Sequence, residues 1–196
     1  MAKPKHIARE DILPMEEYAA IRKDKAREIT ELKRNRRMAV GPDATLYFES
    51  FETMWRQIHE MLFIERGGES QLEDELSAYN PLIPQGQELV ATLMFEIDDR
   101  ARRQRVLGQM GGVEETVELR LGDEVIPARA ETDVDRSTAE GKASSVHFLH
   151  FPFSPEQIQH FRDGSVQVVL AITHPRYAHM AVMPDPVRRA LAEDFD

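Results

Sequence analysis

The sequence contains no cysteine, a single tryptophan, and no apolar run that approaches the length of a membrane-spanning helix. Without cysteine the chain cannot form a disulfide, a thiol nucleophile, a cysteine-ligated zinc site or an iron–sulfur cluster of its own. The N-terminal residues also lack the apolar core of a secretory signal. We therefore expect a cytoplasmic protein with no membrane segment.

The best-known catalytic and ligand-binding motifs are also missing. There is no phosphate-binding G-x-x-x-x-G-K-S/T loop, no dinucleotide-binding G-x-G-x-x-G and no G-x-S-x-G nucleophile turn. His59 and Glu60 begin an H-E-x-x-H zinc motif, but Phe63 occupies the position of its second histidine. Residues 133–141 resemble a calcium loop, yet Thr138 stands where that loop requires glycine.

Charge is unevenly distributed along the chain. Its 35 acidic and 25 basic residues give a net charge of −10. Residues 1–37 contain eleven Lys/Arg and seven Asp/Glu, a balance of +4, which leaves −14 on the remainder. A basic arm on an acidic body could bind RNA, an acidic partner protein or its own body, and it could equally be a solvated helix face.

Hydrophobic periodicity predicts helices in the first part of the chain. Residues 14–37 have a helical apolar stripe, and residues 51–66 repeat apolar side chains at i, i+3 and i+4 before a Gly-Gly stop. A shorter helix is expected over residues 69–79, ending before Pro81. Between the first two helices, residues 36–50 predict two strands joined by a turn at Gly41.

After Pro84 the apolar period changes from about 3.6 to 2, which is typical of strands. Hairpin turns and inserted short helices then alternate to the end of the chain. We expect an α+β fold with one largely antiparallel sheet of about six to eight strands and about four to six helices packed around it. Residues 1–196 should form a single domain in which residues 1–13 are a flexible tail.

Two histidines lie in the apolar segment SSVHFLHFPF, at positions 147 and 150. Successive side chains of a strand point to opposite faces, so a spacing of three places His147 and His150 on opposite sides of the sheet. They therefore cannot bind one metal ion together. A hydrogen-bonded, partly buried histidine is the more common outcome for each of them.

Three other residues are the candidate metal ligands: Glu65, His174 and His179. On a helical wheel Glu65 falls within about 20° of the apolar stripe of residues 51–66, so it should reach the edge of the core, where a carboxylate needs a partner. The alternative is that the helix ends there and Glu65 contacts water. His174 and His179 flank a turn, with Tyr177 on the same strand face as His179. Surface aromatics at an ordinary turn are the alternative for this cluster.

Four segments, RRMAVGPDATLYFES, QIHEMLFIER, ELSAYNPLIP and VQVVLAITHPRY, occur in this order. With them the chain, from about Pro14 to its C-terminal helix, resembles a family of uncharacterised bacterial proteins known only as a domain of unknown function. Genes of that family often lie beside genes for rubrerythrin and for an iron–sulfur oxidoreductase. The resemblance implies a cytoplasmic role near peroxide or redox chemistry, and it supplies no catalytic residue and no cofactor.

Three functions are compatible with these features. The first is a non-catalytic accessory protein that binds a redox partner in peroxide or oxidative-stress metabolism, with the basic N-terminal helix as a docking element. The second is a metal-dependent enzyme with a His/carboxylate site, such as non-haem iron, built from the three candidate ligands. The third is RNA binding through residues 22–37 and 101–105, which lack interleaved aromatics and any RNA-binding signature. A homodimer is compatible with all three.

Overall fold

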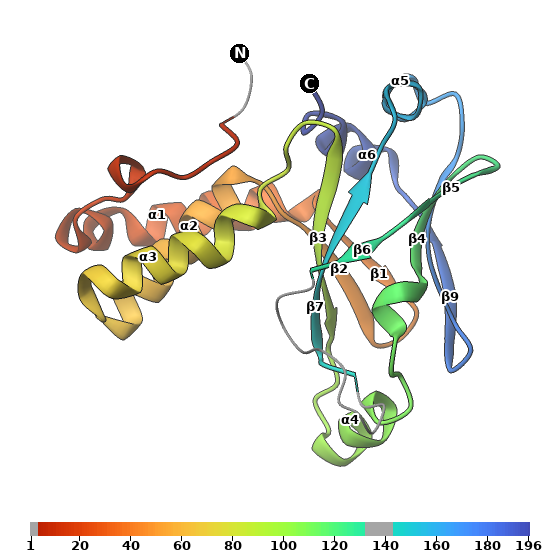
Figure 1. Cartoon of the computed structure of the whole chain (residues 1–196), viewed down its shortest axis with the longest axis horizontal. Helices are drawn as coiled ribbons and strands as arrows, with labels where there is room; N and C mark the ends of the chain where they lie inside the picture. Colours follow the sequence, from red (N-terminus) through yellow and green to blue (C-terminus); the bar gives the residue numbers. More distant parts are fainter. Residues whose placement is uncertain (1–3, 132–142) are drawn as a thin grey trace.

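The strands form two antiparallel sheets in the computed structural model, which describes residues 4–131 and 143–196 (Figure 1). Sheet A has the order β1-β2-β3-β7-β6, and sheet B has the order β5-β4-β8-β9. The strands are β1 Arg37–Val40, β2 Ala44–Phe48, β3 Glu88–Phe95, β4 Val117–Leu121, β5 Glu124–Pro127, β6 Arg129–Ala130, β7 Val146–Pro152, β8 Val168–His174 and β9 Tyr177–Val182. The α+β class is confirmed, although the nine described strands are divided between two sheets. The calcium-like segment 133–141 lies outside the described residues.

Within the described ranges, six α-helices and three short 3-10 helices lie before, between and after these strands. They are η1 Arg9–Asp11, α1 Met15–Arg34, α2 Phe51–Glu65, α3 Gly68–Tyr79, η2 Asn80–Leu82, α4 Arg100–Leu107, η3 Val113–Thr116, α5 Pro155–Asp163 and α6 Asp185–Ala192. Three helices begin at a side-chain cap: Ser50 caps α2, Asp99 caps α4 and Ser154 caps α5, each accepting a backbone N–H. In this part of the chain, no helix is both long and apolar enough to cross a membrane.

The elements stack in three layers. Helices α1, α2 and α3 lie on one side of sheet A, and sheet B lies on its other side (Figure 1). Leu89 and Leu93 of β3 belong to the core between the sheets, whereas Val90 of the same strand packs with Ile58 of α2 in a second cluster under the helices. Strand β3 is therefore buried on both faces, which explains why its apolar run is almost continuous.

The two sheets are connected at both sides. At one side the chain leaves β5 of sheet B, passes Ala128 and enters β6 of sheet A, with the Ala128 N–H donating to the Val117 carbonyl at 2.9 Å. At the other side the Tyr177 hydroxyl of β9 hydrogen-bonds to the turn between β1 and β2. The inner faces of the sheets consequently enclose one continuous core.

The N-terminal arm, residues 4–14, differs from the expectation of a flexible tail. Ile7 is fully buried, and its backbone N–H and carbonyl both hydrogen-bond to the Asn80 side chain, at 2.7 and 3.0 Å. Further along the arm, the Leu13 N–H donates to Nε2 of His59 at 3.0 Å. A single buried isoleucine and a few long-range hydrogen bonds fix the arm, and these leave no periodic signal in a short polar segment.

Candidate functional site

The two histidines of β7 lie on opposite faces, as their spacing predicts. His147 is buried in the core between the sheets, and its Nε2 lies 3.0 Å from the Ser144 carbonyl. His150 lies on the other face between two carboxylates, with Nδ1 3.1 Å from Glu88 and Nε2 2.8 Å from Glu131. The hydrogen bond to Glu88 is the main reason that the pKa of His150 is raised. Each histidine has a separate hydrogen-bonding role.

Glu65 does not enter the core. It is exposed at the last position of α2 and accepts a hydrogen bond from the Gln71 side chain at 3.0 Å. The next residue, Arg66, takes a left-handed conformation that ends the helix. The prediction that Glu65 reaches the core edge is therefore wrong, because the apolar stripe ends at Leu62 and the last turn of α2 faces solvent.

The partly buried carboxylate of α2 is Glu60 instead. Its carboxylate accepts a hydrogen bond from the Tyr18 hydroxyl at 2.6 Å and from Arg22 at 2.8 Å, both on α1. The sequence argument places Glu60 on the solvent side because it lies opposite the apolar stripe. It misses this residue because α1 covers that side of α2, and only the Tyr18 side chain, buried on α1, could have indicated it.

The cluster around Tyr177 has a structural role that its geometry explains. The buried Tyr177 hydroxyl accepts the N–H groups of Asp43 and Ala44 at 2.8 and 2.9 Å and donates to the Val40 carbonyl at 2.8 Å. Burial raises the pKa of Tyr177. The rings of Tyr177 and His179 pack with centroids 4.6 Å apart, so the predicted shared face is correct. Together they hold the turn between β1 and β2.

Gly41 shows how tightly that turn is held. It has a φ of +72°, and a Cβ at this position would lie 2.6 Å from the His179 ring. His174, at the end of β8, uses Nδ1 to accept the Arg176 N–H at 3.2 Å. The imidazole of His174 is thus hydrogen-bonded to the backbone, and the imidazole of His179 is packed against Tyr177 and Gly41.

The three candidate metal ligands are not brought together. Glu65 ends α2 in the helical layer, whereas His174 and His179 belong to strands of sheet B on the far side of sheet A (Figure 1). Among the described residues, no group of three or more His, Asp or Glu side chains has an arrangement that could hold a metal ion. The predicted combination of ligands therefore has no geometric support.

The basic N-terminal segment is less basic on α1 than its composition indicates. Residues 15–34 contain six Lys/Arg and five Asp/Glu, a balance of +1. Exposed i,i+3 pairs join Lys25 to Glu28, and similar pairs involve Arg27 and Arg34. Such pairs neutralise one another's long-range field, so charge alone gives α1 little attraction for an acidic partner or for RNA.

A further buried carboxylate, Glu49, is missed by the sequence argument. It follows β2 directly and is 5% exposed. Its two oxygens accept hydrogen bonds from the hydroxyls of Thr53 and Thr92, at 2.6 and 2.7 Å. The position of this glutamate, between a strand and the Ser50 helix cap, is the sequence feature that could have indicated its burial. Its hydroxyl partners meet the requirement that a buried carboxylate be hydrogen-bonded.

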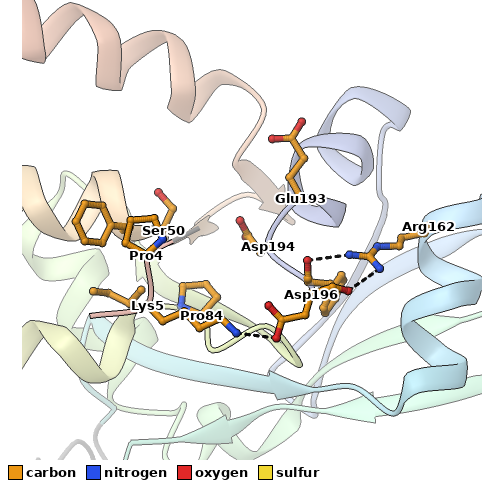
Figure 2. Close-up of a pocket in the computed structure, with 11 residues that line it drawn as sticks. Pro4, Lys5, Ser50, Pro84, Arg162, Glu193, Asp194 and Asp196 are labelled. Carbon is orange, nitrogen blue, oxygen red and sulfur yellow. Dashed lines mark hydrogen bonds and ion pairs between the residues drawn. The ribbon is translucent and has the colours of Figure 1, made fainter. Parts of the chain in front are cut away.

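A polar cavity lies where the two ends of the described chain meet. Its volume is about 720 Å³, and Figure 2 shows its lining side chains. The cavity is lined by Pro4, Lys5, Ser50, Phe51, Ile83, Pro84, Arg162, Glu193, Asp194, Phe195 and Asp196. Cations, carboxylates and an apolar wall therefore share one space of the size that small-molecule sites have.

Asp194, which lines this cavity, belongs to a buried ion pair. Arg36, which directly precedes β1, and Asp194, which follows α6, are 2% and 3% exposed at their side chains. Arg36 Nη1 lies 3.2 Å from Asp194 Oδ1, and the same guanidinium donates to the carbonyls of Phe48 and Glu49 at 3.1 and 2.7 Å. Arg36 therefore compensates the negative charge of Asp194 at the cavity wall.

The outer face of sheet B is a second distinctive surface. The strand register places Val125, Arg120, Val169 and Val182 in one row across the four strands, with Met180 beside them. In Figure 1 the helices of the described residues lie over sheet A and at the ends of the sheets, and none of these helices covers this side of sheet B. We call this surface the outer face. It consists of the partly or fully exposed side chains of Arg120, Val125, Val169, Met180 and Val182, together with Glu118, the ion-pair partner of Arg120.

Comparisons with known proteins identify relatives without a known activity. A family described as "Protein of unknown function (DUF3501)" matches residues 6–195. A crystal structure at 1.90 Å of a novel protein of unknown function from Burkholderia pseudomallei K96243 is similar, with a TM-score of 0.89 and 34% identity. The alignment covers 97% of this chain and 99% of that one. None of the curated proteins matches.

Proposed function

The chain belongs to the family described as Protein of unknown function (DUF3501), and from that premise we propose that it is a cytoplasmic, non-catalytic accessory protein that binds a redox partner through the outer face of sheet B. One observation carries the proposal. Of the four large hydrophobic side chains exposed in the described residues, Val125, Met180 and Val182 gather on this face. Exposed apolar patches of this kind mark interaction surfaces.

The chemistry of the outer face favours a protein ligand. Met180 is 59% exposed, and an unbranched thioether adapts to varied apolar partners. Arg120 lies in the middle of the face, donating to Glu118 at 2.7 Å, and its Nη1 is 3.8 Å from the Met180 sulfur. Arginine within an apolar surround is a common anchor of protein interfaces. The fitting partner surface is apolar, with a carboxylate opposite Arg120.

Charge argues for a different protein rather than a second copy of this chain. The net charge of −10 would be doubled in a homodimer, and its self-repulsion opposes association. A less acidic partner avoids this cost. The homodimer that the sequence permits is therefore the less favoured occupant of the outer face.

The redox class of the partner rests on two points. The chain has no cysteine, so it cannot relay electrons through thiols or through a cluster of its own. Its family resemblance implies genes for rubrerythrin and an iron–sulfur oxidoreductase nearby. In such a setting the partner holds the redox centre, and this chain contributes binding or positioning.

The test is co-purification of the tagged full chain after mild crosslinking in its natural host. We expect one captured protein whose purified complex has the visible absorption of a flavin, an iron–sulfur cluster or non-haem iron. Met180→Asp should reduce capture at least tenfold, because it places a charge in the apolar contact. Ile64→Asp is the matched control, since Ile64 is 64% exposed on α2, away from the outer face.

Four results would contradict the proposal. Recovery of the tagged protein alone would show that it has no stable protein partner under these conditions. Crosslinking only to a second copy would replace it with a homodimer. Equal capture by Met180→Asp and by the wild-type chain would exclude the outer face, and a captured protein without a redox centre would exclude the redox class.

A further inference from the structure

Asp196 and Phe195 are held in the 720 Å³ cavity like a bound ligand. The Lys5 ammonium lies 2.6 Å from the Asp196 carboxylate, and Arg162 donates to the main-chain oxygens of Phe195 and Asp196, each at 2.8 Å. The Asp196 N–H donates to the Gly86 carbonyl at 3.0 Å. Figure 2 shows Lys5 and Arg162 reaching Asp196 from opposite sides. The side-chain carboxylate, the main-chain oxygen and the N–H of Asp196 thus each have a partner.

Close packing at Gly86 defines one boundary of this position. A Cβ on Gly86 would lie 2.4 Å from an Asp196 carboxylate oxygen and 2.6 Å from Lys5 Nζ. Gly86 also has a φ of +91°, a conformation that other residues rarely adopt. The loop before β3 therefore comes as close to the Lys5–Asp196 pair as a backbone can.

The remaining walls suit an organic anion. Phe51, Ile83 and Phe195 supply apolar contact, and the first turn of the 15-residue helix α2, at Ser50 and Phe51, adds the partial positive charge of a helix N-terminus. Asp194 brings no uncompensated negative charge because it is paired with Arg36. In Figure 2 the Glu193 side chain points away from Asp196.

We infer that this cavity binds a small organic carboxylate in the place that the Asp196 side chain fills. The ligand carboxylate pairs with Lys5, while Arg162 keeps its hydrogen bonds to the main-chain oxygens of Phe195 and Asp196 and adds positive charge beside the site. Asp196 is then an intramolecular competitor for the site. This inference concerns a different surface from the outer face of sheet B and does not depend on the proposed function.

A ligand needs to displace only the Asp196 side chain, whose single ion pair is exposed, and the main chain of this residue can stay in place. The Lys5 and Asp196 side chains are 33% and 57% exposed. Ion pairs of this exposure contribute little to stability, because water competes for both charges. A ligand that also contacts the apolar wall has an advantage that the Asp196 side chain alone lacks.

The test is a titration of the ¹⁵N-labelled full chain with N-acetyl-L-aspartate, which carries a carboxylate and carbonyl groups as residue 196 does. We expect shifts of the Gly86 and Asp196 amides that saturate in the millimolar range, typical of a small ligand. Asp196→Asn should bind about two- to fivefold more tightly, the size of effect expected for an exposed ion pair. Lys5→Met should bind at least fivefold more weakly.

Two controls separate this site from general charge effects. Glu28→Gln removes one carboxylate from an exposed pair with Lys25 on α1, so it changes the net charge as Asp196→Asn does and should leave the affinity unchanged. Met180→Asp should also bind N-acetyl-L-aspartate normally, whatever happens to partner capture.

The inference fails if neither the wild-type chain nor Asp196→Asn shows shifts at Gly86 at about 10 mM ligand, a concentration about ten times a dissociation constant of about 1 mM. Equal affinity in Lys5→Met would remove Lys5 from the site. Inorganic phosphate that produces the same shifts with the same affinity would show a general anion effect, and the assignment to an organic carboxylate would be wrong.

Discussion

Glu60 shows how a polar residue contributes to the contact between two helices. Its carboxylate bridges from α2 to Tyr18 and Arg22 of α1, with Arg56 of its own helix 3.5 Å away. The hydrogen bond from Arg22 is the largest effect on its pKa, which falls from 4.5 to about 2. Burial, together with the hydrogen bond to Glu60, raises the pKa of Tyr18. The ionised carboxylate is thus the form that the fold favours.

We predict that Glu60→Gln lowers the free energy of unfolding by about 1–3 kcal/mol at pH 7, because the charge-assisted hydrogen bonds are lost. A lowered pKa means that the carboxylate stabilises the fold fully above pH 4.5 and loses that contribution as pH falls toward 2. The difference between the two proteins should therefore shrink over this interval. Urea unfolding at a series of pH values measures it.

Glu52→Gln is the matched control for Glu60→Gln, since Glu52 is exposed in the first turn of the same helix. It should change stability by less than about 0.5 kcal/mol. A stability difference for Glu60→Gln that stays constant from pH 7 to pH 3 would mean that the carboxylate charge has no part in the contact.

At the scale of elements, the N-terminal arm is attached to α2 through His59. Nδ1 of the buried ring lies 2.7 Å from the Trp55 carbonyl, which can only accept, so Nδ1 carries the proton. Nε2 is then free to accept the Leu13 N–H. The ring packs between Trp55 and Tyr18, with centroids 3.8 and 4.7 Å away. Burial lowers the pKa of His59, so the neutral imidazole is the form in the fold.

We predict that acid weakens this attachment. Because the pKa of His59 is below 6.5 in the folded chain, the stability that the neutral ring provides is complete above pH 6.5 and decreases as pH falls below it. A protonated Nε2 can no longer accept from Leu13. The Leu13 amide should therefore lose hydrogen-exchange protection, relative to its intrinsic rate, as the pH is lowered from 6.5.

His59→Phe provides the comparison, since phenylalanine keeps a packed ring that cannot take up a proton. Its Leu13 amide should be poorly protected at every pH. The Trp55 indole N–H donates to the Asp11 carbonyl of the arm at 2.8 Å. Neither group of this hydrogen bond titrates in this pH range, so the exchange of the indole N–H shows whether the rest of the arm stays in place. Leu13 protection in the wild-type chain at pH 7 that is no greater than in His59→Phe would exclude His59 as the point of attachment.

At the scale of the whole molecule, the Arg36–Asp194 pair connects the start of sheet A to the last residues of the chain. The partners are 158 positions apart in sequence and almost completely buried. Such a pair contributes little net stability compared with apolar residues of the same size, but removing one partner leaves an uncompensated charge in the interior. The C-terminal side of the ligand cavity depends on this pair.

We predict that Arg36→Met lowers the free energy of unfolding by about 3–5 kcal/mol, because Asp194 is left buried without its cation. The double variant Arg36→Met/Asp194→Leu should recover part of this loss. Recovery should be incomplete, since the carbonyls of Phe48 and Glu49 also lose their donor. Urea unfolding of the single and double variants gives the coupling energy.

The exposed pair of Arg34 and Glu31 is the internal reference for this cycle. Their side chains are 67% and 63% exposed, so Arg34→Met should change stability by less than about 1 kcal/mol. A double variant that is no more stable than Arg36→Met would show that the lost hydrogen bonds, and not the unpaired carboxylate, cause the destabilisation.

Features that depend on neighbours along the chain are the ones that the sequence by itself determined. The apolar spacing of Met54, Ile58 and Leu62 is a property of one helix, and it identifies the face of α2 that is buried. The opposite orientations of His147 and His150 follow from the two-residue period of a single strand. The antiparallel α+β class follows in the same way from successive strands and short turns.

The tertiary structure alone decided what meets across long stretches of sequence. It selected Glu60 over Glu65, because α1 packs on the side of α2 that a helical wheel assigns to solvent. It also divided the strands into two sheets, leaving the outer face of sheet B uncovered by the described helices. The cavity around Lys5, Arg162 and Asp196 exists only where both ends of the described chain converge. Local periodicity reports burial on one element, whereas these sites depend on contacts between elements far apart in the chain.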